Sequence, residues 1–174
     1  MTGLPLSQFS RLMAMIKQED VVRIPLGNGV HALIDEADAE LVAGYDWRFF
    51  KTGYAYAPVG RKYILLHRLV MNVDSSKQFV DHIDGDRLNN QRHNLRLCTH
   101  AENMRNRTST TGTSRFKGVY ATKAGTWRSA ISLNGVRHRL GTFTSEVKAA
   151  MAYDKAAREL HGEFARTNAD LNYY

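Results

Sequence analysis

Cysteine is almost absent from this chain of 174 residues, because Cys98 is its only one. A lone cysteine excludes an internal disulfide and any zinc knuckle built from several cysteines. Long apolar runs are also absent, and the N-terminus lacks the charged start, apolar core and small-residue cleavage site of a signal peptide. We therefore expect an intracellular protein that makes no use of a membrane.

Acidic residues are scarcer than basic ones, with 17 Asp and Glu against 24 Lys and Arg, and the formal net charge is +7. The excess is uneven: the net charge is −2 over residues 1–60, +4 over residues 61–111 and +5 over residues 112–174. A solvated basic surface alone could have this composition. However, a localised excess of Lys and Arg is typical of nucleic-acid binding, because these side chains replace the counterions of phosphates.

Residues 79–107 contain the side chains that metal-dependent phosphodiester cleavage needs. Asp81 and His82 lie in a short β-like stretch, turn residues follow, and residues 94–97 alternate polar with apolar as a return strand would. Thr99 is a suitable N-cap for a helix that continues to about residue 107. The spacing thus predicts a ββα unit. Neighbouring strand residues point to opposite faces, so Asp81 and His82 would have separate tasks, one holding a metal and the other handling water.

This segment resembles the HNH endonuclease family, specifically the homing endonucleases with a ββα-metal site. The resemblance covers roughly residues 67–107. It implies that Asp81 is the first metal ligand and that His82 is the general base that activates water. It further implies that Asn94 holds the histidine through a carbonyl contact and that Asn103 is the metal ligand on the helix.

Arg107 stands where many HNH nucleases carry another histidine, four residues after the helix ligand. An arginine cannot bind a cation, so the protein would supply one carboxylate and one amide oxygen. Scissile phosphate and water would provide the remaining ligands. This donor set suits Mg²⁺ or Mn²⁺ better than a structural Zn²⁺, and we expect one such divalent ion.

Three histidines near this segment have weaker claims to a role. His67 opens an apolar helix-like stretch, where it would either border the site or serve packing and capping. His93 and His100 have polar neighbours and are expected to be solvated.

Residues 114–168 show a second pattern, in which three strand-like segments precede one helix. Ser145 is the expected N-cap of this helix and Gly162 its stop. The helix should cover one face of the sheet with its apolar stripe and leave the other face for an anionic partner. The stripe consists of Ala149, Tyr153, Ala156 and Leu160.

This region resembles the AP2 DNA-binding domain across nearly all of that domain's length. The matching motifs begin at Phe116, Trp127, Leu140 and Ala152. The resemblance implies that basic side chains of the sheet enter the major groove, whereas Trp127 is expected to pack in the core. Tyr120 and Thr122 stand where plant-type domains often have arginine, so a GC-rich target is not expected. The candidate DNA contacts in the two segments, residues 79–107 and 114–168, are Lys117, Arg128, Arg137, Arg139, Arg96, Arg105 and Arg107.

The N-terminal part offers no catalytic set. We expect a hairpin around residues 27–29, a helix capped by Asp35 that runs to about residue 44, and a further strand pair before residue 67. Residues 6–16 have the apolar spacing of a short helix. This part resembles the N-terminal modules of phage and mobile-element HNH proteins.

The sequence therefore predicts an α+β protein with an N-terminal support module at 1–60, a nuclease unit at 61–107, a linker at 108–114 and an AP2-like domain at 115–170. Its expected function is that of a sequence-directed, homing-type DNA endonuclease in the cytoplasm of a bacterial host. It would act on double-stranded DNA and make a nick or a double-strand break, as a monomer or a homodimer. The alternative is a non-catalytic AP2-type DNA-binding regulator.

Overall fold

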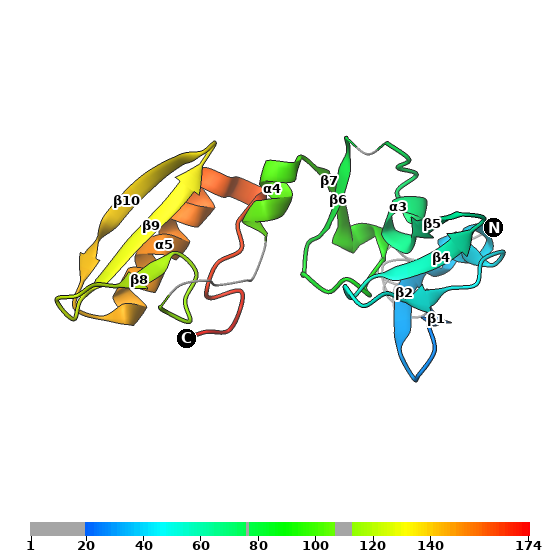
Figure 1. Ribbon diagram of the computed structural model, residues 1–174, viewed down its shortest axis with the longest axis horizontal. Coiled ribbons are helices and arrows are strands. Elements are labelled where there is room, and N and C mark those ends of the chain that lie inside the picture. The colour runs from blue at the N-terminus through cyan, green and yellow to red at the C-terminus, as the bar shows by residue number, and fades with distance from the viewer. Residues whose placement is uncertain (1–19, 76, 107–112) are drawn as a thin grey trace, which may run out of the picture. The chain divides into compact units, whose positions relative to one another are not determined.

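The computed structural model describes residues 20–75, 77–106 and 113–174, which mix helices and strands, as expected for an α+β protein. These residues form two compact units (Figure 1). The first unit contains residues 20–75 and 86–96, and the second contains the remaining described residues. The units therefore divide the segment in which we expected a single nuclease module. The domain boundary expected at 108–114 stays a prediction, because residues 107–112 lie outside the described part of the chain.

The first unit begins with a hairpin and continues with a three-stranded sheet. Strands β1 (Val21–Pro25) and β2 (His31–Asp35) pair antiparallel, which confirms the hairpin around residues 27–29. The sheet has the order β3-β4-β5. Its strands are β3 (Arg48–Phe49), β4 (Ala55–Val59) and β5 (Lys62–Leu65), and the short helix α3 (Leu66–Val70) follows.

The helix expected after Asp35 differs from the prediction. It consists of the 3-10 turn η1 (Glu36–Asp38) and the short helix α2 (Ala39–Val42). Asp35 does not cap it, because its carboxylate accepts hydrogen bonds from the Gln91 side chain at 3.2 Å and the Arg92 backbone N–H at 2.8 Å. The apolar stretch at residues 6–16 lies outside the described residues.

Strands β6 (Phe79–His82) and β7 (Leu95–Cys98) form a two-stranded sheet, and helix α4 (His100–Arg105) follows directly. The 3-10 turn η2 (Arg92–Asn94) precedes β7. Thr99 caps α4 as predicted. Its hydroxyl accepts from the Glu102 backbone N–H, and the Glu102 carboxylate accepts from the Thr99 backbone N–H, so the two residues form a capping box.

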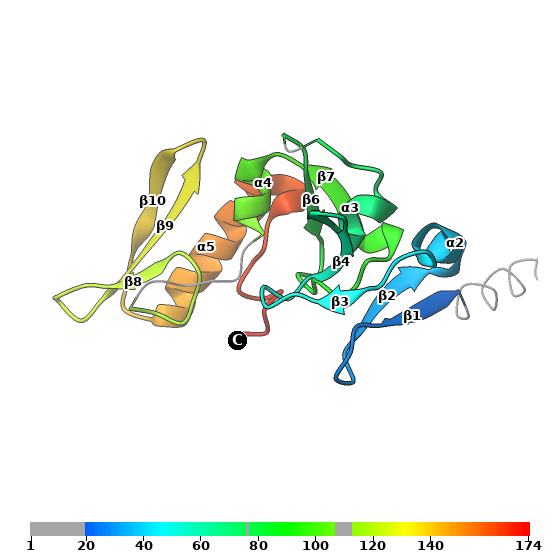
Figure 2. The same ribbon diagram turned by 45° about the vertical axis from the view of Figure 1, so that its right-hand side comes forward.

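The C-terminal part of the second unit, residues 113–174, is a three-stranded antiparallel sheet of order β10-β9-β8 with one long helix. The elements are β8 (Val119–Ala121), β9 (Trp127–Leu133), β10 (Val136–Phe143), α5 (Glu146–His161) and the 3-10 turn η3 (Gly162–Phe164). Helix α5 lies along one face of the sheet (Figures 1 and 2). We call this part the C-terminal fold.

The core of the C-terminal fold lies between α5 and the sheet. Ala149 and Tyr153 are buried there, and Trp127 packs against this core, as expected. Ser145 caps α5 through the Lys148 backbone N–H, and the helix ends before Gly162, which has a φ of 55°. Leu160 is an exception to the predicted stripe, because it is 37% exposed.

Candidate active site

Strand β6 brings Asp81 and His82 into the structure as a buried polar pair. Their exposed fractions are 5% and 4%. The strand ends at His82, and the chain turns through Gly85, whose backbone N–H donates to the His82 carbonyl oxygen at 3.0 Å. Gly85 has a φ of 79°, a conformation that side chains other than glycine rarely adopt. The turn thus fixes the end of the strand that carries the predicted base.

Asn106, the C-cap residue of α4, meets this pair from the helix side. Its amide nitrogen is 2.9 Å and 3.0 Å from the two carboxylate oxygens of Asp81 and 2.7 Å from the His82 carbonyl oxygen. All three atoms are acceptors, so the amide must present its N–H groups to them. Its oxygen is consequently turned away, and within the described residues this buried Oδ1 has no hydrogen-bond partner.

Asn106 was not among the site residues predicted from the sequence, although its spacing from Asn103 could have indicated it. Residues three positions apart lie on the same side of a helix, so Asn106 shares a side with Asn103. Asn103 itself is half-buried within α4. The helix ends at Arg105, about two residues earlier than we expected, which places Asn106 at its C-cap, where the side chain contacts Asp81.

Two other predicted site residues belong to the first unit. Asn94 is buried there, and its amide donates to the Asn89 carbonyl oxygen at 2.8 Å, which ties the loop before β7. His67 is 5% exposed within α3, and the centre of its ring lies 5.1 Å from that of Tyr54. The proposed contact of Asn94 with the histidine base stays a prediction.

The residues around Asp81 fit a hard divalent cation. Asp81 offers a carboxylate, whereas Asn106 Oδ1 faces away from that carboxylate because the amide nitrogen binds it. This buried oxygen without a partner costs about 1–3 kcal/mol unless a ligand satisfies it. No cluster of three or more His, Cys, Asp or Glu side chains suited to a metal occurs in residues 20–75, 77–106 and 113–174. A site with few oxygen ligands from the protein and no thiolate leaves the other ligand positions to phosphate and water. Mg²⁺ and Mn²⁺ are commonly bound in this way.

The face of the β8–β10 sheet opposite α5 carries exposed arginines. Arg137 pairs with Ser132 and Arg139 with Ala130 across β9 and β10, and these positions alternate with Ile131, which packs against α5. Arg128 lies on the same face by this alternation and is also exposed. The guanidinium carbon of Arg137 lies 4.7 Å from the centre of the Tyr120 ring. We call these three arginines the sheet arginines.

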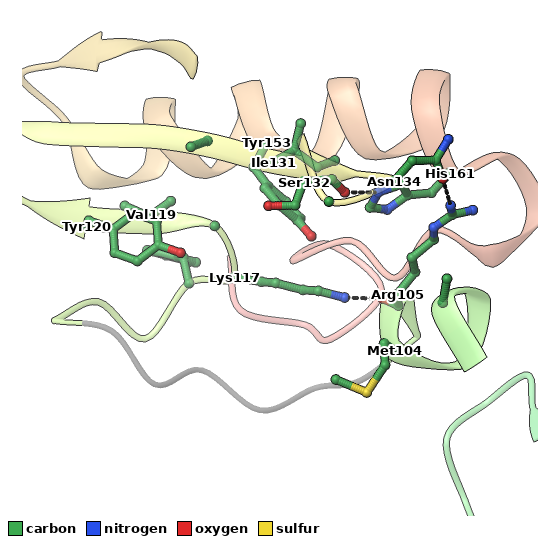
Figure 3. Close-up of a pocket in the computed structure, with 15 residues that line it drawn as sticks. Met104, Arg105, Lys117, Val119, Tyr120, Ile131, Ser132, Asn134, Tyr153 and His161 are labelled. Atoms are coloured by element: carbon green, nitrogen blue, oxygen red, sulfur yellow. Dashed lines mark hydrogen bonds between the residues drawn. The ribbon is translucent and has the colours of Figure 1, made fainter. Parts of the chain in front are cut away.

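Lys117 differs from the sheet arginines because its ammonium points into the protein. It donates to the backbone oxygen of Arg105 (Figure 3). It also donates, at 3.2 Å, to the backbone oxygen of Arg166. Burial, and then the positive charge of Arg166, lower the pKa of the Lys117 ammonium to about 8. We therefore leave Lys117 out of the DNA contacts proposed below.

The three candidates for phosphate contacts near the cut site have different surroundings. Arg105 is half-buried, and its guanidinium donates to the Asn134 side-chain oxygen at 3.2 Å (Figure 3). Arg96 is half-buried on β7, within the first unit. Arg107 lies outside the described residues.

Comparison with known proteins identifies the family of this chain. An HNH endonuclease family model matches residues 72–105, which include β6, β7 and α4. An uncharacterized HNH endonuclease of Acanthamoeba polyphaga mimivirus is 32% identical over 148 residues, which cover 82% of this chain and 76% of the relative. The chain belongs to the HNH endonuclease family.

Two further relatives match smaller parts of this HNH protein. Protein 3.8 of Escherichia phage T7 is 37% identical over 90 residues, which cover 51% of this chain and 74% of that protein. The APETALA2-like protein 2 of Oryza sativa subsp. japonica is 44% identical over 65 residues, which cover 36% of this chain but only 15% of that protein. The likeness to the plant protein is thus partial, and it adds a second kind of relative to the HNH endonucleases.

In the described part of the chain, no helix combines the length and the apolar character that are needed to cross a membrane.

Proposed function

We propose that this protein is a homing-type DNA endonuclease whose hydrolytic centre is formed by Asp81, His82 and Asn106. The observation that carries the proposal is the buried Asp81 carboxylate, which accepts hydrogen bonds from an Asn106 amide whose own buried oxygen is unsatisfied. Membership of the HNH endonuclease family supports it independently. Buried polar groups of this kind cost free energy, so they favour a chemical role over a purely structural one.

His82 would act as the general base. It would take a proton from the water that attacks the scissile phosphorus in line, which gives a 5′-phosphate and a 3′-hydroxyl. Asp81, together with Asn106 or Asn103, would hold one divalent ion, Mg²⁺ or Mn²⁺. When bound, this ion supplies positive charge to the phosphate and to the leaving oxygen. Asn94 would hold the imidazole in its productive orientation.

The C-terminal fold would serve as an AP2-like reader of double-stranded DNA. The exposed sheet arginines and the partial likeness to plant APETALA2-like proteins support this role. Arg128, Arg137 and Arg139 would contact the major groove or its phosphates, and Arg96, Arg105 and Arg107 remain candidates for contacts near the cut site. A reader in the same chain raises the effective concentration of the nuclease at its target.

The test uses supercoiled plasmid that carries candidate target DNA. Wild-type protein and the His82→Ala variant are incubated with it in Mg²⁺, in Mn²⁺ and in EDTA, and the products are separated on a gel. We expect nicked or linear DNA only with the wild type and a divalent ion, and the rate should fall by about 100-fold or more in the variant, as for loss of a general base. The ratio of nicked to linear product shows whether the protein cuts one strand or both.

DNA that is bound but not cut under either divalent ion would contradict the proposal. That result would favour the alternative, a DNA-binding regulator in which the β6–β7–α4 segment is only a scaffold. Cleavage that persists in His82→Ala would instead show a nuclease with a different base. A parallel reaction with RNA of the same sequence tests the choice of nucleic acid.

A further inference from the structure

The backbone that follows His82 is held by an arginine from the far end of the chain. Arg166 donates from its two terminal nitrogens to the carbonyl oxygens of Ile83, at 3.2 Å, and Asp84, at 2.7 Å. The His82 carbonyl oxygen is already held by Asn106 at 2.7 Å. Three consecutive carbonyl groups at the end of β6 thus accept hydrogen bonds from side chains.

The end of α4 is held by the same region. Lys117 donates to the Arg105 carbonyl oxygen, one residue before Asn106, and also to the Arg166 carbonyl oxygen. A cation at the carbonyl end of a helix is favourable, because unpaired carbonyl groups carry partial negative charge there. Lys117 and Arg166 therefore connect the two elements that bring His82 and Asn106 together.

The backbone next to Arg166 is held in place by buried hydrogen bonds. Asn168, two residues later, is fully buried, and the Asp154 carboxylate of α5 accepts from both its backbone and its side-chain N–H groups at 2.8 Å. Its side-chain oxygen accepts from the Lys117 backbone N–H at 2.6 Å. Within the described residues, the Arg166 Nε atom is buried and has no hydrogen-bond partner, whereas the two bonds from its terminal nitrogens are exposed to solvent.

We infer that Arg166 is a positioning residue for the nuclease site, through which the C-terminal fold sets the end of the strand that carries His82. The inference rests on the function proposed above. Charge-assisted hydrogen bonds from a guanidinium to two adjacent carbonyl groups fix both position and orientation. Displacement of a catalytic group by about 1 Å can reduce the rate by about 100-fold. The C-terminal fold thus has a second task besides binding DNA.

The test compares Arg166→Ala and Arg166→Lys with Lys155→Ala, a control that removes an exposed cation from α5 of the same fold. Single-turnover cleavage at saturating DNA, DNA affinity, thermal melting and amide hydrogen exchange are measured for each full-length variant. We expect Arg166→Ala to cleave about 10- to 100-fold more slowly with its DNA affinity within about twofold of the wild type. The Gly85 amide should exchange faster, and Arg166→Lys should recover part of the rate.

A wild-type cleavage rate and unchanged Gly85 exchange in Arg166→Ala would overturn the positioning role. An equal loss of rate and affinity, or a rate loss explained by global unfolding in the melting curve, would overturn it as well. Failure of the wild type to cut bound DNA is a different outcome, because it overturns the proposed function. In that case the exchange of Gly85 still decides whether Arg166 holds the end of β6.

Discussion

Two regions of the second unit differ in the burial of their polar side chains. Around the end of β6, Asp81, His82 and Asn106 are buried, and Asn106 joins the three through hydrogen bonds. On the outer face of the sheet, the arginines are exposed. One region is built for fixed geometry and the other for access.

The difference matches what each proposed task requires. Proton transfer and metal binding depend on positions held to a fraction of an ångström, which buried and hydrogen-bonded groups provide. Attraction of a DNA backbone needs accessible cations that can follow the phosphates. Variants of the buried region should therefore change the cleavage rate at saturation, whereas variants of the sheet face should change affinity.

Among the variants that test this comparison, the largest effect is expected for Asn106→Ala. We expect about a 100-fold loss in the cleavage rate at saturating DNA, because the variant removes both the support of Asp81 and the unsatisfied amide oxygen. Mn²⁺ binding, followed by calorimetry, should weaken in parallel. Thermal melting of the variant separates these losses from unfolding.

Asn103→Ala is the matched control on the same side of α4. If this variant lost more cleavage and more Mn²⁺ affinity than Asn106→Ala, the amide ligand would be Asn103, as the sequence resemblance implied. A smaller loss would support Asn106. Comparison of these two variants thus identifies which asparagine is the amide ligand of the ion.

Local sequence rules predicted much of the second unit. Thr99 and Ser145 cap the helices as expected, because an N-cap depends on a hydroxyl and a backbone N–H only a few residues away. The contact of Asn106 with Asp81 was not predicted, because the predicted helix extended to residue 107 and placed residue 106 inside the helix instead of at its C-cap. The exact end of a helix varies by one or two residues, and apolar spacing alone defines it poorly.

Contacts between distant segments could not be predicted in the same way. Asp35 was expected to cap a helix, but its carboxylate binds Gln91 and Arg92, more than fifty residues away. Lys117 and Arg166 likewise look like surface cations in the sequence, yet both bind backbone carbonyl oxygens. Charge counts cannot distinguish a cation that faces solvent from one that supports the fold.

The next effect concerns the exposed face of the sheet. We expect the double variant Arg137→Gln and Arg139→Gln to bind target DNA about tenfold more weakly at physiological salt. The slope of log affinity against log salt concentration should fall by about 2, because about one phosphate contact is lost for each arginine. Fluorescence anisotropy titrations at several salt concentrations measure both quantities.

The cleavage rate of this double variant at saturating DNA should stay close to that of the wild type. Lys155→Gln is the control, because it removes an exposed cation from α5, on the other side of the sheet. A fall in the saturated rate would show that the sheet face also affects the chemistry. An unchanged affinity would show that DNA binds elsewhere on the protein.

The smallest effect is a pH dependence that should separate Lys117 from the sheet arginines. Folding lowers the pKa of this lysine from 10.5 to about 8, so between these values the unfolded chain binds more protons than the native state. The contribution of Lys117 to stability should therefore rise with pH through this window. Against Lys117→Met, the wild-type free energy of unfolding should rise by about 1–2 kcal/mol from pH 8 to pH 10. Urea unfolding measures it, and a flat difference would place the ammonium in solvent with the sheet arginines.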